Sequence, residues 1–295
     1  MLIYSTPAST LHITPPGHPE RVDRIAAVER GLIGIPATRR ESPLATDAQI
    51  LLCHPAPYLN RLKSITGTAQ LDPDTWMSPG SFQAASRAVG GACAAVDAVL
   101  NGDAITAFVV TRPPGHHAET NTAMGFCLFG TVAIAAKHAL TRLNRVAVVD
   151  FDVHHGNGTQ DLLWSEPRAL LITSQQMPLW PGSGAPSERG AHGQIINLPL
   201  PPGSNGAHMR ATYDAHAFPA FDPELILISA GFDAHADDLL ANLNWQADDF
   251  AWLTRRICAI GTGRVVSCLE GGYNLDALIA SVAAHVAVLQ EHSHG

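Results

Sequence analysis

The sequence has no excess of positive charge, no apolar run of membrane-spanning length and no paired cysteine motif. Its 295 residues carry 18 Lys and Arg against 26 Asp and Glu, a formal net charge of −8. This balance argues against a broad surface for nucleic acid phosphates. Apolar runs stay well below the roughly 18 residues of a membrane helix, and the N-terminus shows no basic segment followed by an apolar stretch. We therefore expect no nucleic acid partner, no membrane anchor and no signal peptide.

Cysteine is scarce, whereas histidine is abundant. The five cysteines are odd in number and none are spaced C-x-x-C, which disfavours a disulfide framework and a cysteine-built zinc site. Reduced, buried thiols in a cytoplasmic protein are the expectation. The 15 histidines point instead to metal or proton chemistry.

Apolar residues make up 46% of the chain and charged residues only 15%, so a large buried core is expected. Five short apolar runs are continuous rather than alternating, which is typical of strands buried on both faces of a parallel sheet. These runs cover residues 107–110, 146–149, 170–173, 225–229 and 265–269.

Alanine-rich helical patterns lie between and around these strands, at about 80–100, 130–142, 208–219, 247–260 and 275–290. We expect Asn244 to cap the fourth helix and Gly261 to end it. The alternation predicts an α/β fold, a doubly wound parallel sheet in a single domain over residues 1–295.

Polar clusters follow four of the five predicted strands directly. In open parallel sheets, ligands bind in the crevice beyond the carboxyl ends of the strands. Each cluster alone could be a loop with satisfied polar groups, but four at one edge indicate one pocket. The clusters lie at residues 112–117, 150–156, 230–233 and 270–274.

Asp152 and His154 are separated by one residue in an extended segment, so their side chains point to the same face. Asp233, after another strand, is the best candidate for a third ligand. Two carboxylates and one imidazole that leave a position for water describe an open catalytic metal site. Zinc fits best, with iron or cobalt as alternatives. A capped turn is the structural alternative for the Asp-x-His pair.

A rigid Pro-Pro-Gly turn presents two adjacent histidines, His116 and His117. Both rings need partners, and Asp150 and Asn157 are available as the groups that fix their tautomers. A carboxylate raises the basicity of a histidine more than an amide does, so the two histidines need not share one role. Tyr273 follows two glycines and could donate a hydrogen bond to a developing oxyanion. Ordinary buried histidines and a buried tyrosine are the alternatives.

With these residues assembled, the chain resembles the zinc-dependent histone deacetylase superfamily, which includes bacterial deacetylase-like and acetylpolyamine amidohydrolase members. The motifs appear in family order over residues 18 to 274. They are His18-Pro-Glu-Arg-Val-Asp-Arg24, Arg112-Pro-Pro-Gly-His-His-Ala118, Gly125-Phe-Cys127, Asp150-Phe-Asp-Val-His-His-Gly-Asn-Gly158, Ser229-Ala-Gly-Phe-Asp233 and Glu270-Gly-Gly-Tyr-Asn274. The resemblance implies an arginase–deacetylase α/β fold and hydrolysis of an N-acyl amine.

The resemblance also implies roles for individual residues. One zinc ion per chain would be held by Asp152, His154 and Asp233. His117 would be the general base and later acid, with His116 as its electrostatic partner bound to Asp150, and Tyr273 would polarise the carbonyl. Gly125 and Phe126 would form the floor and one wall of an acyl-lysine tunnel and Trp180 the other wall, with Arg24 lining an internal channel. The family further suggests a potassium ion near Asp150 and Ser174, and we place His18 and Glu20 at the pocket rim.

Two positions bear on the substrate. At the position of Asn157, nuclear-type members carry Asp. An Asn at this position resembles the second eukaryotic class and its bacterial relatives. Leu240 stands where polyamine-selective relatives carry Glu, which favours an acetyl-lysine side chain or another short acyl-amine over an acetylpolyamine. An acetylpolyamine deacetylase is the first alternative.

Two more distant alternatives share the pocket. The segment Asp233-Ala-His235-Ala-Asp237 resembles the ligand motif of binuclear manganese ureohydrolases, although the twin histidines have no place in that chemistry. A non-catalytic acyl-amine binding protein would not need His117 or Tyr273. The physiological substrate, the acyl length, the native metal and the oligomeric state are left open by the sequence.

Overall fold

The five apolar runs form adjacent strands in an eight-stranded sheet of the computed structural model, which describes residues 1–216 and 221–293. Every pairing in this sheet is parallel. The predicted α/β sheet is therefore confirmed. In spatial order, the strands are β2 (Thr38–Glu41), β1 (Leu2–Ser5), β5 (Thr106–Val109), β10 (Val265–Leu269), β9 (Leu225–Ala230), β6 (Val146–Asp150), β7 (Ala169–Gln176) and β8 (Ile195–Leu200).

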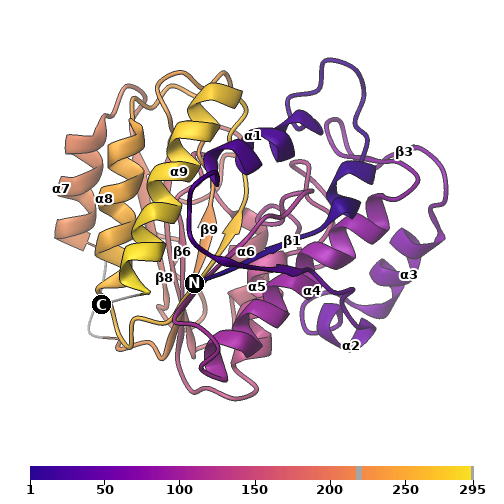
Figure 1. The fold of residues 1–295 in the computed structure, drawn as a ribbon, viewed down its shortest axis with the longest axis horizontal. Helices are drawn as coiled ribbons and strands as arrows, with labels where there is room; N and C mark the ends of the chain where they lie inside the picture. The colour runs from indigo at the N-terminus through magenta and orange to yellow at the C-terminus, as the bar shows by residue number, and fades with distance from the viewer. Residues whose placement is uncertain (217–220, 294–295) are drawn as a thin grey trace.

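Helices cover both faces of the sheet, as a doubly wound topology requires (Figure 1). One face packs on α1 (Asp23–Gly31), α7 (Gly206–His216), α8 (Ala247–Cys258) and α9 (Leu275–His292). The other packs on α2 (Asp47–Ile50), α3 (Ala56–Ser64), α4 (Ser81–Leu100), α5 (Thr131–Ala139) and α6 (Asn157–Leu163). A short 3-10 helix, η1 (Pro7–Leu11), and a small antiparallel hairpin, β3 (Ala69–Gln70) with β4 (Trp76–Met77), lie outside these layers.

The sequence pattern located the inner strands and missed β1, β2 and β8. The side chains of β6 and of its neighbour β9 are all buried, because each strand has a strand on both sides and helices on both faces. Strand β2, Thr-Arg-Arg-Glu, is exposed at every residue, so hydrophobicity gave no signal there. Strand β8 forms the other edge and contains Pro199, which edge strands tolerate.

The five predicted helices are present, with small shifts at their ends. Helix α8 begins after Gln246, whose backbone N–H donates to the carboxylate of Asp249 at 2.9 Å, so the expectation of an Asn244 cap is wrong. The amide of Asn244 instead donates to the carbonyl of Gly203, at 3.2 Å. Gly261 follows the end of α8 with a positive φ of 59°. Of the expected helix 208–219, positions 217–219 lie outside the described residues.

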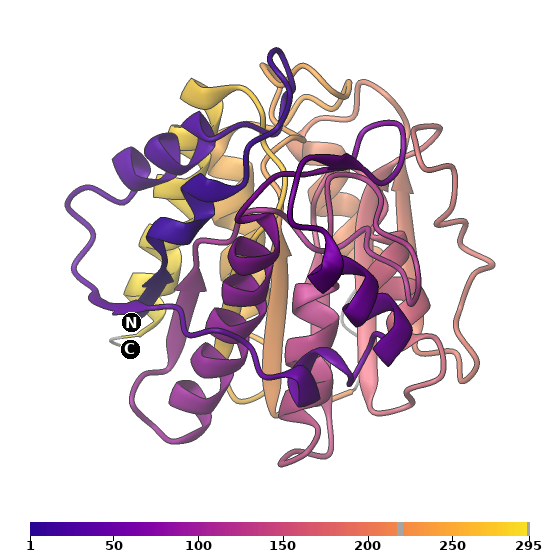
Figure 2. The same ribbon diagram turned by 90° about the vertical axis from the view of Figure 1, so that its right-hand side faces the viewer.

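The strands that precede the four polar clusters, β5, β10, β9 and β6, are neighbours at the centre of the sheet. Their carboxyl ends therefore meet at one edge, where the connecting loops gather above the strand arrowheads in Figure 2. Among the described residues, no helix is both long and apolar enough to cross a bilayer.

Candidate active site

Asp152, His154 and Asp233 meet at this edge of the sheet. One ligand atom from each of the three lies within 4.8 Å of the other two, and this is the one such group among the described residues. Nδ1 of His154 lies 3.2 Å from Oδ1 of Asp152 and 3.1 Å from Oδ2 of Asp233. Both carboxylates are almost fully buried. Backbone N–H groups fix them further, since Val153 donates to Asp233 and Gly271 donates to Asp152.

The protonation of these three groups fits a metal site. Burial, together with repulsion from Asp152, raises the pKa of Asp233 to about 7. Burial opposes the charge on His154, but hydrogen bonds to Asp152 and Asp233 raise the pKa of this histidine to about 10. Two buried carboxylates this close need a proton or a cation between them. The oxygen and nitrogen donors fit a divalent transition metal such as zinc.

Glycine is required where the chain passes the triad. A Cβ on Gly271 would lie 2.4 Å from Oδ2 of Asp233 and 2.5 Å from Oδ2 of Asp152. Any side chain there would displace the two carboxylates, so the Gly-Gly sequence before Tyr273 serves the triad as well as the tyrosine.

The rings of the two histidines lie against each other, with centroids 4.0 Å apart and planes tilted by 43°, and each has its own partner. Nδ1 of His116 lies 3.0 Å from a carboxylate oxygen of Asp150. Nδ1 of His117 lies 2.7 Å from the amide oxygen of Asn157. Both pairings were predicted as options from the sequence, and the structure brings all four side chains together.

The surroundings of the two histidines shift their pKa values in opposite directions. Burial disfavours the charged form of His116, but the nearby carboxylates of Asp152 and Asp150 raise its pKa well above the ordinary value. Burial lowers the pKa of His117, and the neighbouring His116 and His154 lower it further. One ring is thus suited to remain a cation and the other to accept a proton.

The aromatic residues expected at a tunnel lie beside His117 and Tyr273. The ring of Trp180 lies edge-on to His117, at 4.7 Å between centroids, and the ring of Phe126 lies edge-on to Tyr273 at 5.8 Å. A Cβ on Gly125 would lie 2.5 Å from the ring of His117 and 2.6 Å from that of Trp180. Gly125 therefore lies between the two rings, where only a residue without a side chain fits.

Tyr273 is buried, and burial raises the pKa of its phenol well above the ordinary value, so the group stays a hydrogen-bond donor. The guanidinium of Arg24 lies 5.0 Å from the centre of this ring and donates to the backbone carbonyl of Gly272 at 2.7 Å. Leu240 and His18 line a cavity of about 570 Å³ in front of Tyr273.

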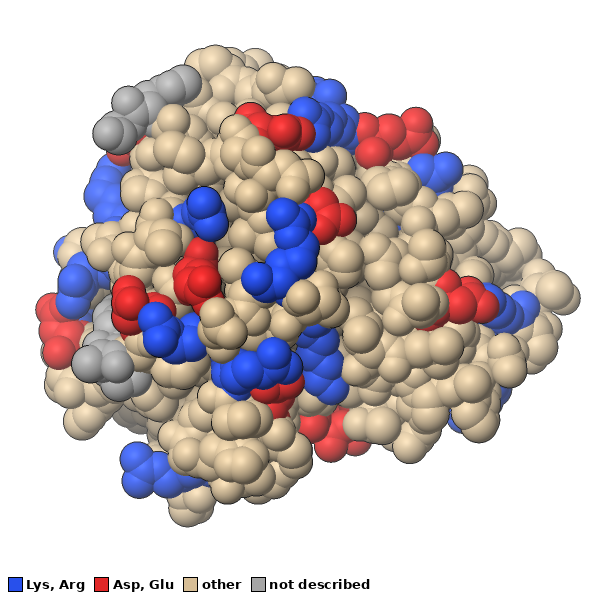
Figure 3. Space-filling view, turned by 90° about the horizontal axis from the view of Figure 1, so that it is seen from below, with Lys and Arg blue, Asp and Glu red and all other residues tan. Residues whose placement is uncertain are grey.

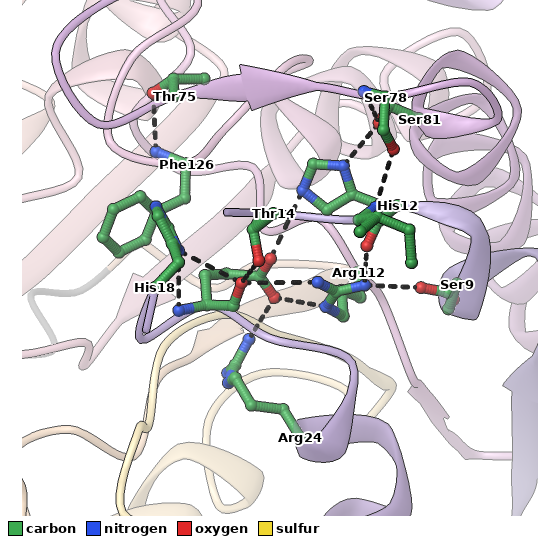
Figure 4. A network of polar contacts seen from close by, with 12 residues as sticks. Ser9, His12, Thr14, His18, Arg24, Thr75, Ser78, Ser81, Arg112 and Phe126 are labelled. Carbon is green, nitrogen blue, oxygen red and sulfur yellow. Dashed lines mark hydrogen bonds and ion pairs between the residues drawn. The ribbon is translucent and has the colours of Figure 1, made fainter. Parts of the chain in front are cut away.

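The expectation for Glu20 is wrong, because this side chain is fully buried rather than at the rim. Its carboxylate lies 2.7 Å from Nε of Arg112 and 3.2 Å from a guanidinium nitrogen of Arg24. Arg112 also donates to the backbone carbonyls of Ser9 and His12 (Figure 4). Burial would raise the pKa of Glu20, but His12 and the two arginines hold it well below the ordinary value. Glu20 thus anchors the N-terminal segment beneath the pocket.

Three further carboxylates, to which the sequence assigned no role, hold the site together. Asp238 accepts hydrogen bonds from the backbone N–H groups of Tyr273 and Asn274, at 2.6 and 3.0 Å. Glu270 accepts the N–H of Gly115 at 2.6 Å, just before the twin histidines. Glu119 accepts from the amide of Asn157 at 2.8 Å. The position of Glu270 at a strand end was a usable signal, whereas the partners of Asp238 and Glu119 are set by tertiary structure.

Positive and negative side chains are interspersed on the face of the molecule drawn in Figure 3. This face presents no large area of one sign.

Comparison with known proteins gives the family. A model of the histone deacetylase domain matches residues 16–289. An uncharacterized protein of Synechocystis sp. is 42% identical over 285 residues, covering 92% of this chain and 93% of its own. The histone deacetylase-like amidohydrolase of Pseudomonas aeruginosa is 40% identical over 250 residues, covering 80% of this chain and 66% of its own. The crystal structure of the HDA15 HD domain superposes with a TM-score of 0.94 at 29% identity, covering 98% of this chain and 90% of that one.

The fold and the site define a hydrolase of the deacetylase and amidohydrolase class. The chain belongs to the histone deacetylase domain family. The predicted family is thereby confirmed.

Proposed function

We propose that this protein is a zinc-dependent deacylase that hydrolyses the acetyl, or another short acyl, group from an N-acylated amine. The observation that carries the proposal is the Asp152–His154–Asp233 triad, buried beside two histidines of opposite basicity. When bound by the triad, zinc would polarise the acyl carbonyl and acidify a water molecule.

The chain's own residues supply the proton transfers. His117 accepts the proton of the attacking water at Nε2, because its Nδ1 is occupied by Asn157. His116, held as a cation by Asp150, stabilises the negative charge that develops in the pocket. The phenol of Tyr273 donates to the former carbonyl oxygen. His117 then returns its proton to the departing amine.

The pocket entrance supports an acyl-lysine side chain as the substrate. Phe126 and Trp180 would line the aliphatic chain, and Gly125 allows it to pass close to His117. Leu240 contributes an apolar side chain to the entrance, where a carboxylate would be needed to attract the internal amine of a polyamine. An acetylpolyamine is the second candidate substrate, because the family includes enzymes for it.

Two further assignments belong to the proposal. A potassium ion near Asp150 and Ser174 is supported by the polar groups gathered there, including the Tyr213 hydroxyl that donates to Ser174 at 2.9 Å. A reducing compartment such as the cytoplasm is supported by the five cysteines, each of which is buried and forms no disulfide.

A panel of acyl-amines tests the proposal. Acetyl-lysine peptides, longer acyl-lysine peptides and N8-acetylspermidine would be incubated with zinc-loaded and with metal-free protein, and the released amine measured. We expect turnover only with metal and a preference for the lysine peptides. The Asp233→Asn variant should lose both zinc and turnover. Saturable binding without turnover by the loaded protein would refute the enzyme assignment, and a preference for the polyamine would refute the substrate assignment.

The site also bears on the alternative of a binuclear manganese ureohydrolase. His235 and Asp237 do not join the triad within the described part of the chain, and the side chain of Asp237 is 73% exposed. A second, buried manganese site therefore has no support. One zinc per chain on metal analysis is the expected result, against two manganese ions for a ureohydrolase.

A further inference from the structure

Asn157 is held by His117 on one side and by Glu119 on the other, with a weaker contact from its amide nitrogen to the sulfur of Met124 at 3.4 Å. Its amide oxygen lies 2.7 Å from Nδ1 of His117, and its amide nitrogen donates to the carboxylate of Glu119 at 2.8 Å. Asn157 is the first residue of α6 and is buried, whereas Glu119 is partly exposed and belongs to the segment that follows the twin histidines. The three side chains form one continuous line from the pocket towards the surface.

The donors and acceptors of Glu119, Asn157 and His117 can be assigned in one consistent way. A carboxylate offers only acceptors, so Glu119 must face the NH2 group of Asn157. The oxygen of the same amide then faces His117, whose Nδ1 must carry a proton in order to donate to it. A neutral His117 consequently presents a free lone pair at Nε2, the atom that faces the pocket. Without Glu119, the Asn157 amide could rotate by half a turn, offer NH2 to Nδ1 and force the proton onto Nε2.

We propose that Glu119 is a positioning residue for the reaction: it fixes the orientation of the Asn157 amide and, through it, the tautomer in which His117 can accept a proton. This inference rests on the proposed function, since it takes His117 as the proton acceptor. Glu119 itself need not touch the substrate.

The segment that carries Glu119 has its own anchor, which provides a matched control. The backbone N–H and the hydroxyl of Thr120 both donate to Asp161, at 2.8 and 2.6 Å. Asp161→Asn weakens the anchoring of the same segment, and Asp161 is not among the side-chain partners of Asn157. A merely structural effect of Glu119 should appear in this control as well.

A four-protein cycle separates positioning from loop stability. It compares the wild type, Glu119→Gln, Asn157→Asp and the double variant, all loaded with zinc and assayed on an acetyl-lysine peptide. A glutamine can present either oxygen or NH2 to Asn157, so the amide is no longer forced into one orientation. We expect Glu119→Gln to lower kcat by about tenfold, the effect of a weakened charge-assisted hydrogen bond, with KM little changed. In the Asn157→Asp background, Glu119 faces a second carboxylate, so the same substitution should raise kcat.

We therefore expect Glu119→Gln to lower kcat in the wild-type background and to raise it in the Asn157→Asp background. Asp161→Asn should leave kcat within about twofold of wild type. The inference is overturned if Glu119→Gln lowers kcat by the same factor in both backgrounds, leaves kcat unchanged, or changes only KM. It is also overturned if Asp161→Asn reproduces the loss.

A spectroscopic readout keeps this test independent of turnover. In protein labelled with 15N-histidine, the His117 signals are assigned by their absence in His117→Ala. We expect Nδ1 of His117 to carry the proton in the wild type, a shift towards Nε2–H in Glu119→Gln, and a return to Nδ1–H in the double variant. An unchanged tautomer in Glu119→Gln overturns the inference, whereas a wild type that hydrolyses no acyl-amine refutes the proposed function alone.

Discussion

Asp152 and Asp233 follow different strands, yet both place a carboxylate oxygen within 3.2 Å of a single atom, Nδ1 of His154. The register of the sheet produces this meeting, because the last residue of β6, Asp150, is paired with Ser229 of β9. Asp152 follows this pair by two residues on one strand and Asp233 by four on the other, so both emerge at the same edge of the sheet. The sheet itself sets the spacing of the ligands, and the loops only complete it.

Gly271→Ala should damage the metal site without unfolding the protein. The added methyl group would lie 2.4 and 2.5 Å from the carboxylates of Asp233 and Asp152, so one of them must move. We expect zinc affinity to fall at least about tenfold, the effect of displacing a ligand's support. Competition with a chelator measures the affinity, and thermal unfolding of the metal-free protein reports its stability. Gly67→Ala is the control, since a Cβ there meets nothing within 4 Å. Equal affinities in the two variants would contradict the proposed ligand set.

Tyr273→Phe should lower kcat by roughly 10²- to 10³-fold, the loss seen when one oxyanion donor is removed. The ring packs on Phe126 and on Arg24, and phenylalanine keeps both contacts. Binding of the acyl-amine should therefore change little, and the loss should appear in kcat rather than in KM. Steady-state kinetics on an acetyl-lysine peptide measure both. An unchanged kcat would remove Tyr273 from the mechanism.

The inner strands and the triad were predictable because each depends on a local signal. A strand buried on both faces must be apolar throughout, and a polar residue directly after such a strand lies at the carboxyl edge. Asp152, His154 and Asp233 satisfy this rule. Strand β2 was not predictable, because its exposed Arg and Glu side chains carry no hydrophobic pattern.

The groups that support the site were harder to find, because their partners are far away in the sequence. Glu20 lies 92 residues from Arg112, and Asp238 lies 35 residues from the N–H of Tyr273 that it binds. An acidic residue in a single sequence gives no sign of being buried among arginines. Glu20 was therefore expected at the pocket rim, although its burial among His12, Arg24 and Arg112 places it in the interior.

Leu240→Glu should move the substrate preference towards polyamines. Leu240 contributes to the cavity in front of Tyr273, so a carboxylate there would attract the second amine of an acetylpolyamine. We expect the ratio of kcat/KM for N8-acetylspermidine to that for an acetyl-lysine peptide to rise about tenfold, a typical gain for one added charge pair in a partly desolvated site. Leu44→Glu is the control, because this side chain is 53% exposed and does not line the cavity. The same change in both variants would mean that general surface charge, rather than position 240, sets the preference.

His285→Gln should reduce the acid sensitivity of the fold. His285 lies in the core, where its Nδ1 is 2.7 Å from the Thr254 hydroxyl and its Nε2 is 2.8 Å from that of Ser267. Burial lowers the pKa of His285 to about 3. The unfolded chain therefore binds this proton first as the pH falls below about 6.5, and the free energy of unfolding decreases by about 1.4 kcal/mol per pH unit.

Glutamine can make similar hydrogen bonds but does not titrate. Between pH 7 and pH 5, the variant should therefore lose about 2 kcal/mol less unfolding free energy than the wild type does. Urea unfolding of metal-free protein at the two pH values measures this difference, with the exposed His208→Gln as the control. If the wild type and His285→Gln lost equal stability on acidification, His285 would have to be protonated in the folded core, with a water or an acidic partner to accept its charge.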